Sequence, residues 1–228
     1  MGSRSAFPQA ILAAGRTPNP QPAMTPEYWP EAVAHLVAND PVVAAIVAQY
    51  PNETLVCRGD AFGTLARSIV GQQISVKAAA SVWRRLEAAL GGVRPAAVAA
   101  TDTAALLACG LSRAKAGYLG ALARHFLDGL AEPGRWAAMD DTAVIADLVA
   151  IKGIGRWTAE MFLIFNLMRP DVLPLDDIGL RRAMAGAYGL ERVPEPAGMK
   201  AIAARWRPWR SVGTWYLWRS LDPLPVEY

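Results

Sequence analysis

The stretch that decides the fold of this chain is LVAIKGIGRWTA, residues 148–159. Residues 142–150 carry apolar side chains at helical spacing, and a second helical run begins after Gly155. The intervening Gly153-Ile154-Gly155 predicts a very short turn, so the two helices form a hairpin. Because glycines lack Cβ atoms, backbone N–H groups at the start of the second helix can approach an anion closely, and the helix dipole favours that anion.

Two interpretations of the turn are open on these residues alone. In the first, its backbone donors hold a phosphate of a nucleic acid, a contact that reads no base. In the second, the glycines only supply positive φ angles and Ile154 fills the core.

A longer pattern extends this hairpin. The spacing is L-x-x-I-x-G-I-G-x-x-T-A, and Leu-Pro-Leu-Asp-Asp follows at residues 173–177. Together the two segments resemble the helix-hairpin-helix, at residues 142–168 here, and the following Pro and Asp of the helix-hairpin-helix-GPD superfamily of DNA glycosylases. The resemblance implies double-stranded DNA as the partner of the chain.

Position 157 narrows the resemblance to one branch. Lyase members of the superfamily have a lysine there that forms a Schiff base with the sugar, whereas this chain has Trp157. The sequence GIGRWTA is similar to the DNA-3-methyladenine glycosylase II branch. This implies a monofunctional enzyme of base excision repair that flips alkylated bases such as 3-methyladenine and 7-methylguanine out of DNA and hydrolyses their N-glycosidic bonds. The alternatives are a non-catalytic DNA-binding module and a glycosylase for oxidised or mismatched bases.

Two adjacent aspartates compete for the catalytic position. The order of the following Ile-Gly-Leu assigns it, by resemblance, to Asp177, while either Asp176 or Asp177 can cap a helix expected to begin near Ile178. A carboxylate beside C1′ stabilises the oxocarbenium character of the sugar and assists attack by water. An alkylated purine already carries positive charge, so it leaves without a strong general acid.

Tryptophan and arginine are concentrated near the C-terminus, a composition suited to stacking on a base beside a phosphate backbone. The resemblance assigns the substrate pocket to Trp157, Trp218 and Met161. Met161 replaces a tyrosine of the family's bacterial type member, so a more open pocket is expected. Three other tryptophans are expected to be structural: Trp206, Trp209 and Trp215.

The resemblance also implies two sets of contacts with DNA. Residues 69–76 resemble a loop that enters the minor groove and fills the gap left by a flipped nucleotide, with Gln73 as the wedge and Ile74 as the alternative. A surface joint between two helices is the other interpretation of the paired glutamines. The expected DNA-binding residues are Gly153, Gly155, Thr158, Gln72 and Gln73. Lys115, farther along, is expected to be a solvated lysine on a helix face, with an approach to a DNA phosphate as the alternative.

The length, apolar content, charge and cysteine positions of the chain limit the kind of protein it can be. The chain has 228 residues, 53% of them apolar, which is enough for a full core, and its net charge of +3 and pI of 9.0 suit a polyanionic partner. Cys57 and Cys109 lie too far apart for a zinc or iron–sulfur motif and indicate a cytoplasmic protein. No cofactor is expected to be required. The resemblance implies only a Na⁺ or K⁺ ion at the hairpin, held by the carbonyls of Val149, Ile151 and Ile154.

Apolar residues recur at helical spacing, and no stretch shows the sustained alternation of apolar and polar residues typical of β-strands. The sequence therefore predicts an all-α fold. The family layout implies a middle helical subdomain at residues 58–170 and a terminal one formed by residues 25–57 and 171–228, with Asp177 in the cleft between them. Residues 1–24, rich in proline and small residues, are expected to be a flexible leader, native or added. The N-terminal β domain of the DNA-3-methyladenine glycosylase II type member is expected to be lacking. The protein is expected to be a monomer that does not bind membranes.

Overall fold

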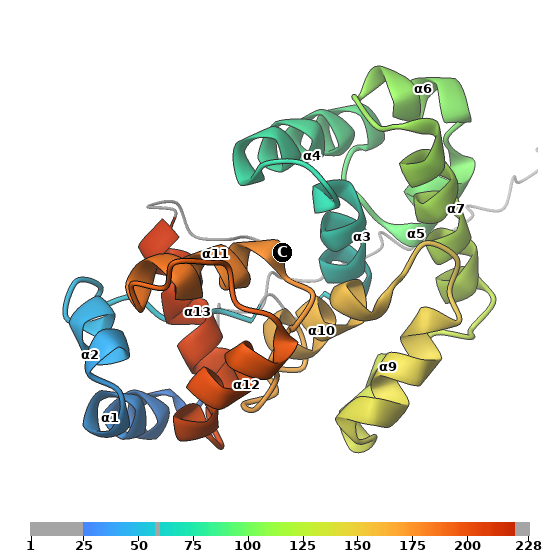
Figure 1. Ribbon diagram of the computed structural model, residues 1–228. Coiled ribbons are helices and arrows are strands. Elements are labelled where there is room, and N and C mark those ends of the chain that lie inside the picture. The colour runs from blue at the N-terminus through green and yellow to red at the C-terminus, as the bar shows by residue number, and fades with distance from the viewer. Residues whose placement is uncertain (1–24, 58–59, 222–228) are drawn as a thin grey trace, which may run out of the picture.

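The computed structural model describes residues 25–57 and 60–221, and these residues form helices and no β-strand (Figure 1). The all-α prediction is therefore confirmed, while the expected leader at residues 1–24 lies outside the described residues. The helices are α1 (Trp29–Asn39), α2 (Pro41–Val47), α3 (Ala61–Gly71), α4 (Val76–Leu90), α5 (Pro95–Ala100), α6 (Thr103–Ala108), α7 (Arg113–Leu127), α8 (Pro133–Ala138), α9 (Asp141–Val149), α10 (Arg156–Phe165), α11 (Ile178–Ala187), α12 (Pro196–Ala203), the 3₁₀ helix η1 (Ala204–Trp206) and α13 (Arg210–Leu221). None of these helices combines the length and apolar character needed to cross a membrane.

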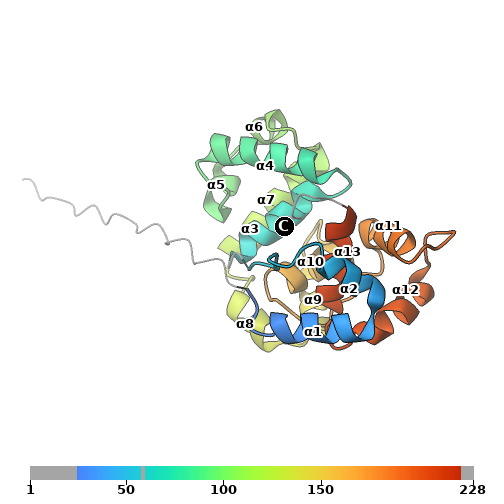
Figure 2. The same cartoon turned by 90° about the vertical axis from the view of Figure 1, so that its left-hand side faces the viewer.

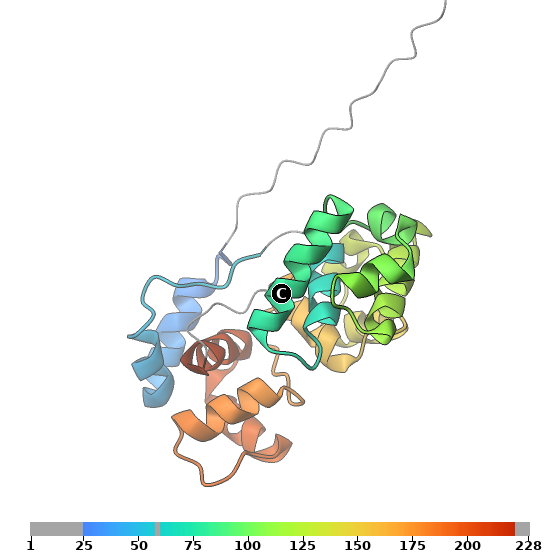
Figure 3. The ribbon, with the colours of Figure 1, turned by 90° about the horizontal axis from the view of Figure 1, so that it is seen from above.

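The helices pack in two groups that lie side by side when the molecule is viewed from above (Figure 3). In one group, α1 packs against α2, η1 and α13, and α13 also contacts α2 and α11. In the other, α3 packs against α4, α7 and α10, while α5 and α6 lie on α7. A single hydrophobic core runs through both groups. The helices α10 and α13 meet in the centre of the molecule (Figure 2), where the rings of Phe165 and Trp218 stack with centroids 5.8 Å apart.

The helices begin where the sequence supplies caps or prolines. The side chains of Ser75, Ser112 and Asp140 accept hydrogen bonds from backbone N–H groups in the first turns of α4, α7 and α9. Proline occupies the first turn of α1, α2, α5, α8 and α12. The hairpin helix expected over residues 142–150 spans Asp141–Val149, because Asp140 caps it.

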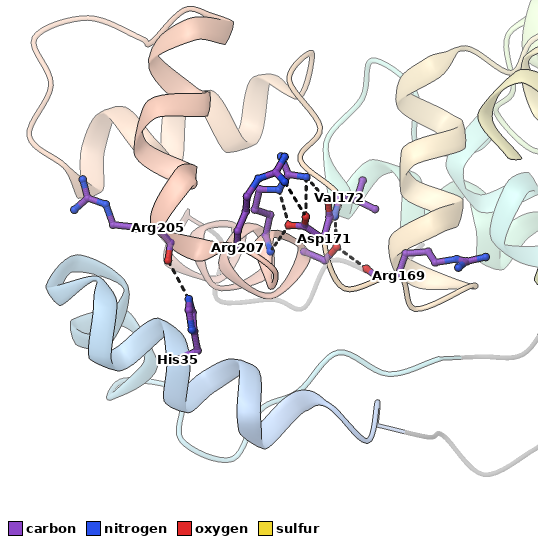
Figure 4. Close-up of polar contacts among 8 residues, drawn as sticks. His35, Arg169, Asp171, Val172, Arg205 and Arg207 are labelled. Carbon is purple, nitrogen blue, oxygen red and sulfur yellow. Dashed lines mark hydrogen bonds and ion pairs between the residues drawn. The ribbon is translucent and has the colours of Figure 1, made fainter. Parts of the chain in front are cut away.

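A buried carboxylate anchors the N-terminal helices to the C-terminal part of the chain. Asp40 is fully buried; it caps α2 and also accepts hydrogen bonds from the Tyr188 hydroxyl at 2.5 Å and from Trp206 Nε1 at 2.9 Å. On α1, His35 Nε2 lies 3.1 Å from the carbonyl oxygen of Arg205, a contact drawn in Figure 4. These contacts join segments more than 140 residues apart.

The connection between α10 and α11 is fixed to α13 by a polar cluster (Figure 4). Asp171 accepts hydrogen bonds from Nε and Nη2 of Arg210 at 2.5 and 3.0 Å, and Nη1 of Arg207 lies 3.8 Å from the same carboxylate. The N–H of Val172 donates to the Ser211 hydroxyl at 2.9 Å. This cluster holds the start of residues 171–177 against the helix that carries Trp218.

Candidate active site

Asp177 lies at the N-terminus of α11 and is held by three N–H donors. Its Oδ1 atom accepts from the backbone N–H of Leu180 at 2.5 Å and from Trp218 Nε1 at 2.9 Å, and its Oδ2 atom accepts from Trp157 Nε1 at 2.7 Å. Only 8% of its surface is exposed, whereas the neighbouring Asp176 is exposed. The cap of α11, which the sequence left open between the two aspartates, is therefore Asp177.

The two indoles reach this carboxylate from helices far apart in the sequence. Trp157 is the second residue of α10, immediately after the hairpin, and is partly exposed. Trp218 lies in α13; one of its faces stacks on Phe165 and only 6% of its surface is exposed. Both residues contact Asp177 through their N–H edges. The structure thus brings together three of the residues assigned by resemblance, with an orienting function that the sequence did not indicate for the two tryptophans.

The burial of Met161 differs from what a more open pocket requires. It lies on α10 one turn after Trp157 and is fully buried. Because its side chain exposes no surface, the structure does not place it on the wall of an open pocket. The other three tryptophans lie in structural positions. Trp206 and Trp215 are buried in the core, and the ring of Trp209 stacks on Tyr28 with centroids 5.4 Å apart.

The two glycines of the hairpin differ in what the fold requires of them. Gly153 has a φ of +94°, and a Cβ atom there would lie 2.2 Å from the ring of Tyr118, so only glycine fits. Ile154 is buried in the core. Gly155, in contrast, has a φ of −94°, faces open space and is the N-cap of α10 without a side-chain cap among the described hydrogen bonds. Its exposed position leaves the N-terminal backbone of α10 accessible to an anion.

The second predicted DNA contact, the loop at residues 71–75, is only partly exposed. Gln72 was expected to contact DNA, but its Nε2 atom donates to the Gly153 carbonyl at 3.0 Å and to Thr158 Oγ1 at 3.3 Å. Its amide therefore binds the hairpin. Gln73 and Ile74 are exposed, and Gln73 has a φ of +59°, which is uncommon for a residue other than glycine. Thr158 is buried, so its hydroxyl faces Gln72 instead of solvent.

Lys115 is not the solvated lysine that the sequence predicted. Its Nζ atom donates to the carbonyls of Val70 at 2.8 Å and Gln72 at 2.6 Å, at the C-terminal end of α3. Burial lowers the pKa of its ammonium group. Periodicity placed Lys115 on a helix, but it does not show which carbonyls of another helix lie within reach. With Gln72, Lys115 forms a brace that joins α7, the loop at residues 71–75 and the hairpin.

Glu160 is a residue that the sequence reasoning missed. It is 4% exposed, its Oε1 atom pairs with Nε of Arg156 at 2.9 Å, and its Oε2 atom has no hydrogen-bond partner among the described residues. The pKa of Glu160 is raised to about 7, chiefly by burial and in smaller part by the carboxylates of Asp176 and Asp177, against the opposing effect of Arg156. A glutamate within an otherwise apolar helical run was the available signal.

Comparison with known proteins identifies the family. The family model for "HhH-GPD superfamily base excision DNA repair protein" matches residues 66–210, a span that contains the loop, the hairpin and Asp177. The chain belongs to this superfamily. Among HhH-GPD proteins, the "DNA-3-methyladenine glycosylase 1" of Schizosaccharomyces pombe is 31% identical over 180 residues, which cover 77% of this chain and 78% of the relative.

Two further comparisons extend this result. The "DNA-3-methyladenine glycosylase 2" of Escherichia coli K12 is 33% identical over 183 residues, covering 74% of this chain and 60% of the relative. A solved structure of the 3-methyladenine DNA glycosylase Mag1 of S. pombe in complex with abasic DNA superimposes with a TM-score of 0.77 at 28% identity. That match covers 87% of this chain and 99% of the solved one. Nearly the whole of that HhH-GPD structure therefore has a counterpart here.

The hairpin's carbonyl groups are chemically suited to a cation, because hard cations prefer oxygen ligands. The carbonyl of Ile151 accepts the N–H of Ile154 at 3.0 Å, and this bond uses one of its two lone pairs. A Na⁺ or K⁺ ion held by the carbonyls of Val149, Ile151 and Ile154 stays a prediction.

Proposed function

We propose that this chain is a monofunctional DNA glycosylase that hydrolyses the N-glycosidic bonds of alkylated bases, including 3-methyladenine and 7-methylguanine, as the first step of base excision repair. The observation that carries the proposal is the carboxylate of Asp177, held between the indole N–H groups of Trp157 and Trp218. The names of the S. pombe and E. coli relatives support the substrate class.

The chemistry follows from the type of carboxylate and its orientation. A base flipped out of the duplex leaves with the electron pair of the C1′–N bond, and an alkylated purine cation becomes neutral as it departs. The sugar then gains positive charge, which the Asp177 carboxylate stabilises. A water molecule adds to C1′, and its proton passes to the carboxylate and from there to solvent. Three fixed donors hold the carboxylate before the reaction begins, so little reorganisation is needed in the transition state.

The absence of a lysine at position 157 distinguishes hydrolysis from lyase chemistry. A Schiff base with the sugar needs an amine at the reacting carbon. Trp157 has none, and its N–H donates to Asp177. Water is therefore the nucleophile in the proposed reaction.

The proposal includes a DNA anchor at the hairpin. The backbone N–H groups of Gly155 and Thr158 bind a phosphate, and a Na⁺ or K⁺ ion on the hairpin carbonyls offsets repulsion between the carbonyl dipoles and DNA. Gln73 enters the base stack as the wedge, with Ile74 beside it. These contacts read no base sequence, as suits an enzyme that acts at lesions in any context.

The test is mass spectrometry of bases released from methylated double-stranded DNA. Wild-type protein is expected to release 3-methyladenine and 7-methylguanine, and the Asp177→Asn variant is expected to release neither while still binding DNA. Asp176→Asn is the matched control, because Asp176 is exposed, and it should keep its activity. Binding without any base release by the wild-type protein would instead indicate a non-catalytic DNA-binding module.

A further inference from the structure

Gly179 is a glycine that its own backbone does not require. It is the second residue of α11, two positions after Asp177, and its φ lies outside the left-handed range in which glycine is favoured. Alanine is a better helix former than glycine, so local helix stability favours a residue with a side chain at this position. The choice of glycine therefore needs another explanation.

The surroundings of Gly179 supply that explanation. A Cβ atom on Gly179 would lie 3.1 Å from Oδ1 of Asp177 and 3.7 Å from both Cδ1 and Nε1 of Trp218. The contact with Trp218 is an ordinary one, but the contact with the carboxylate is tighter than most Cβ contacts in proteins, so one of the two groups must give way by a few tenths of an ångström.

The carboxylate is not free to move away without losing bonds. Oδ1 of Asp177 accepts hydrogen bonds from the backbone of Leu180 and from the indole of Trp218, and Oδ2 accepts one from Trp157. A displacement of the carboxylate that makes room for a methyl group on residue 179 changes the geometry of these three bonds. A side chain there thus acts on the orientation of Asp177.

We propose that Gly179 is a positioning residue for the reaction: the space left by its missing side chain allows the Asp177 carboxylate to sit between the two indole N–H groups. This inference rests on the proposed catalytic role of Asp177. A side chain at position 179 is compatible with the helix α11 itself, but it is not compatible with the observed orientation of the Asp177 carboxylate.

Gly186 offers a matched control in the same helix. It lies near the C-terminal end of α11, its φ is likewise outside the left-handed range, and a Cβ atom there would meet nothing within 4 Å. Both Gly179→Ala and Gly186→Ala add one methyl group and improve helix propensity. Only the first places that methyl group against the carboxylate.

The experiment compares single-turnover rates of 7-methylguanine release by the two variants with binding to DNA that contains an abasic-site analogue. Gly179→Ala is expected to lose at least about ten-fold in rate, because displacements well below 1 Å matter at a reacting centre, with its Kd for DNA unchanged. Gly186→Ala should stay within about two-fold of the wild type in both. A wild-type rate for Gly179→Ala, or equal losses in both variants, would overturn the proposal.

NMR spectra and unfolding temperatures distinguish a displaced Asp177 carboxylate from a displaced α11. Indole N–H resonances in NMR spectra should shift for Trp157 and Trp218 in Gly179→Ala while those of the other tryptophans stay in place. A Gly179→Ala protein that unfolds at lower temperature than Gly186→Ala, with both resonances unmoved, would show that the helix shifted instead of the carboxylate, which contradicts the proposal. If the wild-type protein releases no base, the proposed function fails, and if Asp177→Asn is fully active, the catalytic role of Asp177 fails. If Asp177→Asn is inactive and Gly179→Ala is fully active, only the positioning role of Gly179 fails.

Discussion

At the scale of single residues, the carboxylate of Asp177 combines two tasks that are usually separate. It caps α11 through the N–H of Leu180, and in the proposed function it stabilises the developing sugar cation. The capping bond fixes the side chain relative to the helix, and the two indoles fix the direction of the carboxylate. A structural and a chemical role thus depend on the same few atoms.

The tryptophans can act through their N–H edges or through their faces, and substitution by phenylalanine separates the two. Trp157→Phe keeps an aromatic face but loses the hydrogen bond to Oδ2 of Asp177. If the edge matters, rates should fall by about ten-fold for both 7-methylguanine and the neutral base hypoxanthine, since a hydrogen bond to a charged group contributes about 1.5–3 kcal/mol. Single-turnover assays on both lesions provide the measurement.

The control for this substitution is Trp209→Phe, because Trp209 stacks on Tyr28 away from Asp177. A loss in Trp157→Phe confined to the cationic lesion would favour cation–π recognition by the ring face over the edge contact.

Glu160 gives the folded protein a distinct dependence on pH. Its pKa is about 7 in the folded chain, whereas a glutamate in water has a pKa of 4.5, so the folded state binds more protons between these values. The free energy of unfolding is therefore expected to fall as pH rises from about 4.5 to about 7, by about 3 kcal/mol from this group, and to level off above. Glu160→Gln should remove that decrease in urea unfolding measured across the pH range.

The matched control is Glu195→Gln. Glu195 also pairs with an arginine, Arg181, but its side chain is 80% exposed. Its substitution should leave the pH profile of stability close to that of the wild type. If Glu160→Gln retains the decrease in full, the decrease comes from another carboxyl group such as the partly exposed Asp141, whose pKa burial also raises.

At the scale of elements, the brace of Lys115 and Gln72 couples the loop at residues 71–75 to the hairpin. Lys115→Met removes two hydrogen bonds from a charged donor to the carbonyls of Val70 and Gln72. We expect a loss of about 1–3 kcal/mol in the free energy of unfolding. We also expect slower flipping of a fluorescent base analogue, since the exposed Gln73 then lacks a fixed position relative to the hairpin.

Lys77→Met is the charge-matched control, because Lys77 is an exposed residue of α4 near the same loop. Both variants lose one positive charge, so their general affinity for DNA should fall alike. Equal flipping rates in the two variants would show that the brace does not position the loop.

The hairpin as phosphate anchor is tested by Gly155→Asp. The glycine faces open space at the N-terminus of α10, and a carboxylate there repels a bound phosphate. Affinity for DNA should fall by about ten-fold or more regardless of sequence, and log Kd should depend less steeply on log salt, by about one phosphate contact. Gly134→Asp, at another glycine with open surroundings in α8, carries the same charge change and should have little effect on that slope.

At the scale of the whole molecule, local patterns and long-range contacts differ in how far the sequence predicts them. The hairpin and the start of α11 were predictable because their signals, glycine spacing and an aspartate cap, act within a few residues. The bonds of Gln72 to Gly153 and of Lys115 to Val70 were not, since they join residues 81 and 45 positions apart. Periodicity assigns a face to a helix but does not specify which atoms lie opposite that face.

The attachment of the N-terminal helices depends on one such long-range contact, at Asp40. Asp40→Ala removes the cap of α2 and leaves two donors without this acceptor, the hydroxyl of the partly buried Tyr188 and the indole of the buried Trp206. Unpaired buried donors cost about 1–3 kcal/mol each, so the expected loss in the free energy of unfolding is about 3 kcal/mol or more by urea titration. Because α13 packs on α2 and carries Trp218, base release should also slow at temperatures well below the melting point.

Asp102→Ala separates the long-range contact of Asp40 from simple capping. Asp102 caps α6 through the N–H of Ala105 at 2.7 Å and is exposed, so its loss should cost only about 1 kcal/mol, the ordinary value of an N-cap, without effect on base release. The difference between the two variants measures what the contacts of Asp40 with Tyr188 and Trp206 contribute. If the two losses are equal, the N-terminal helices are held by apolar packing alone, with Trp29 against Trp215 and Tyr216 at its centre.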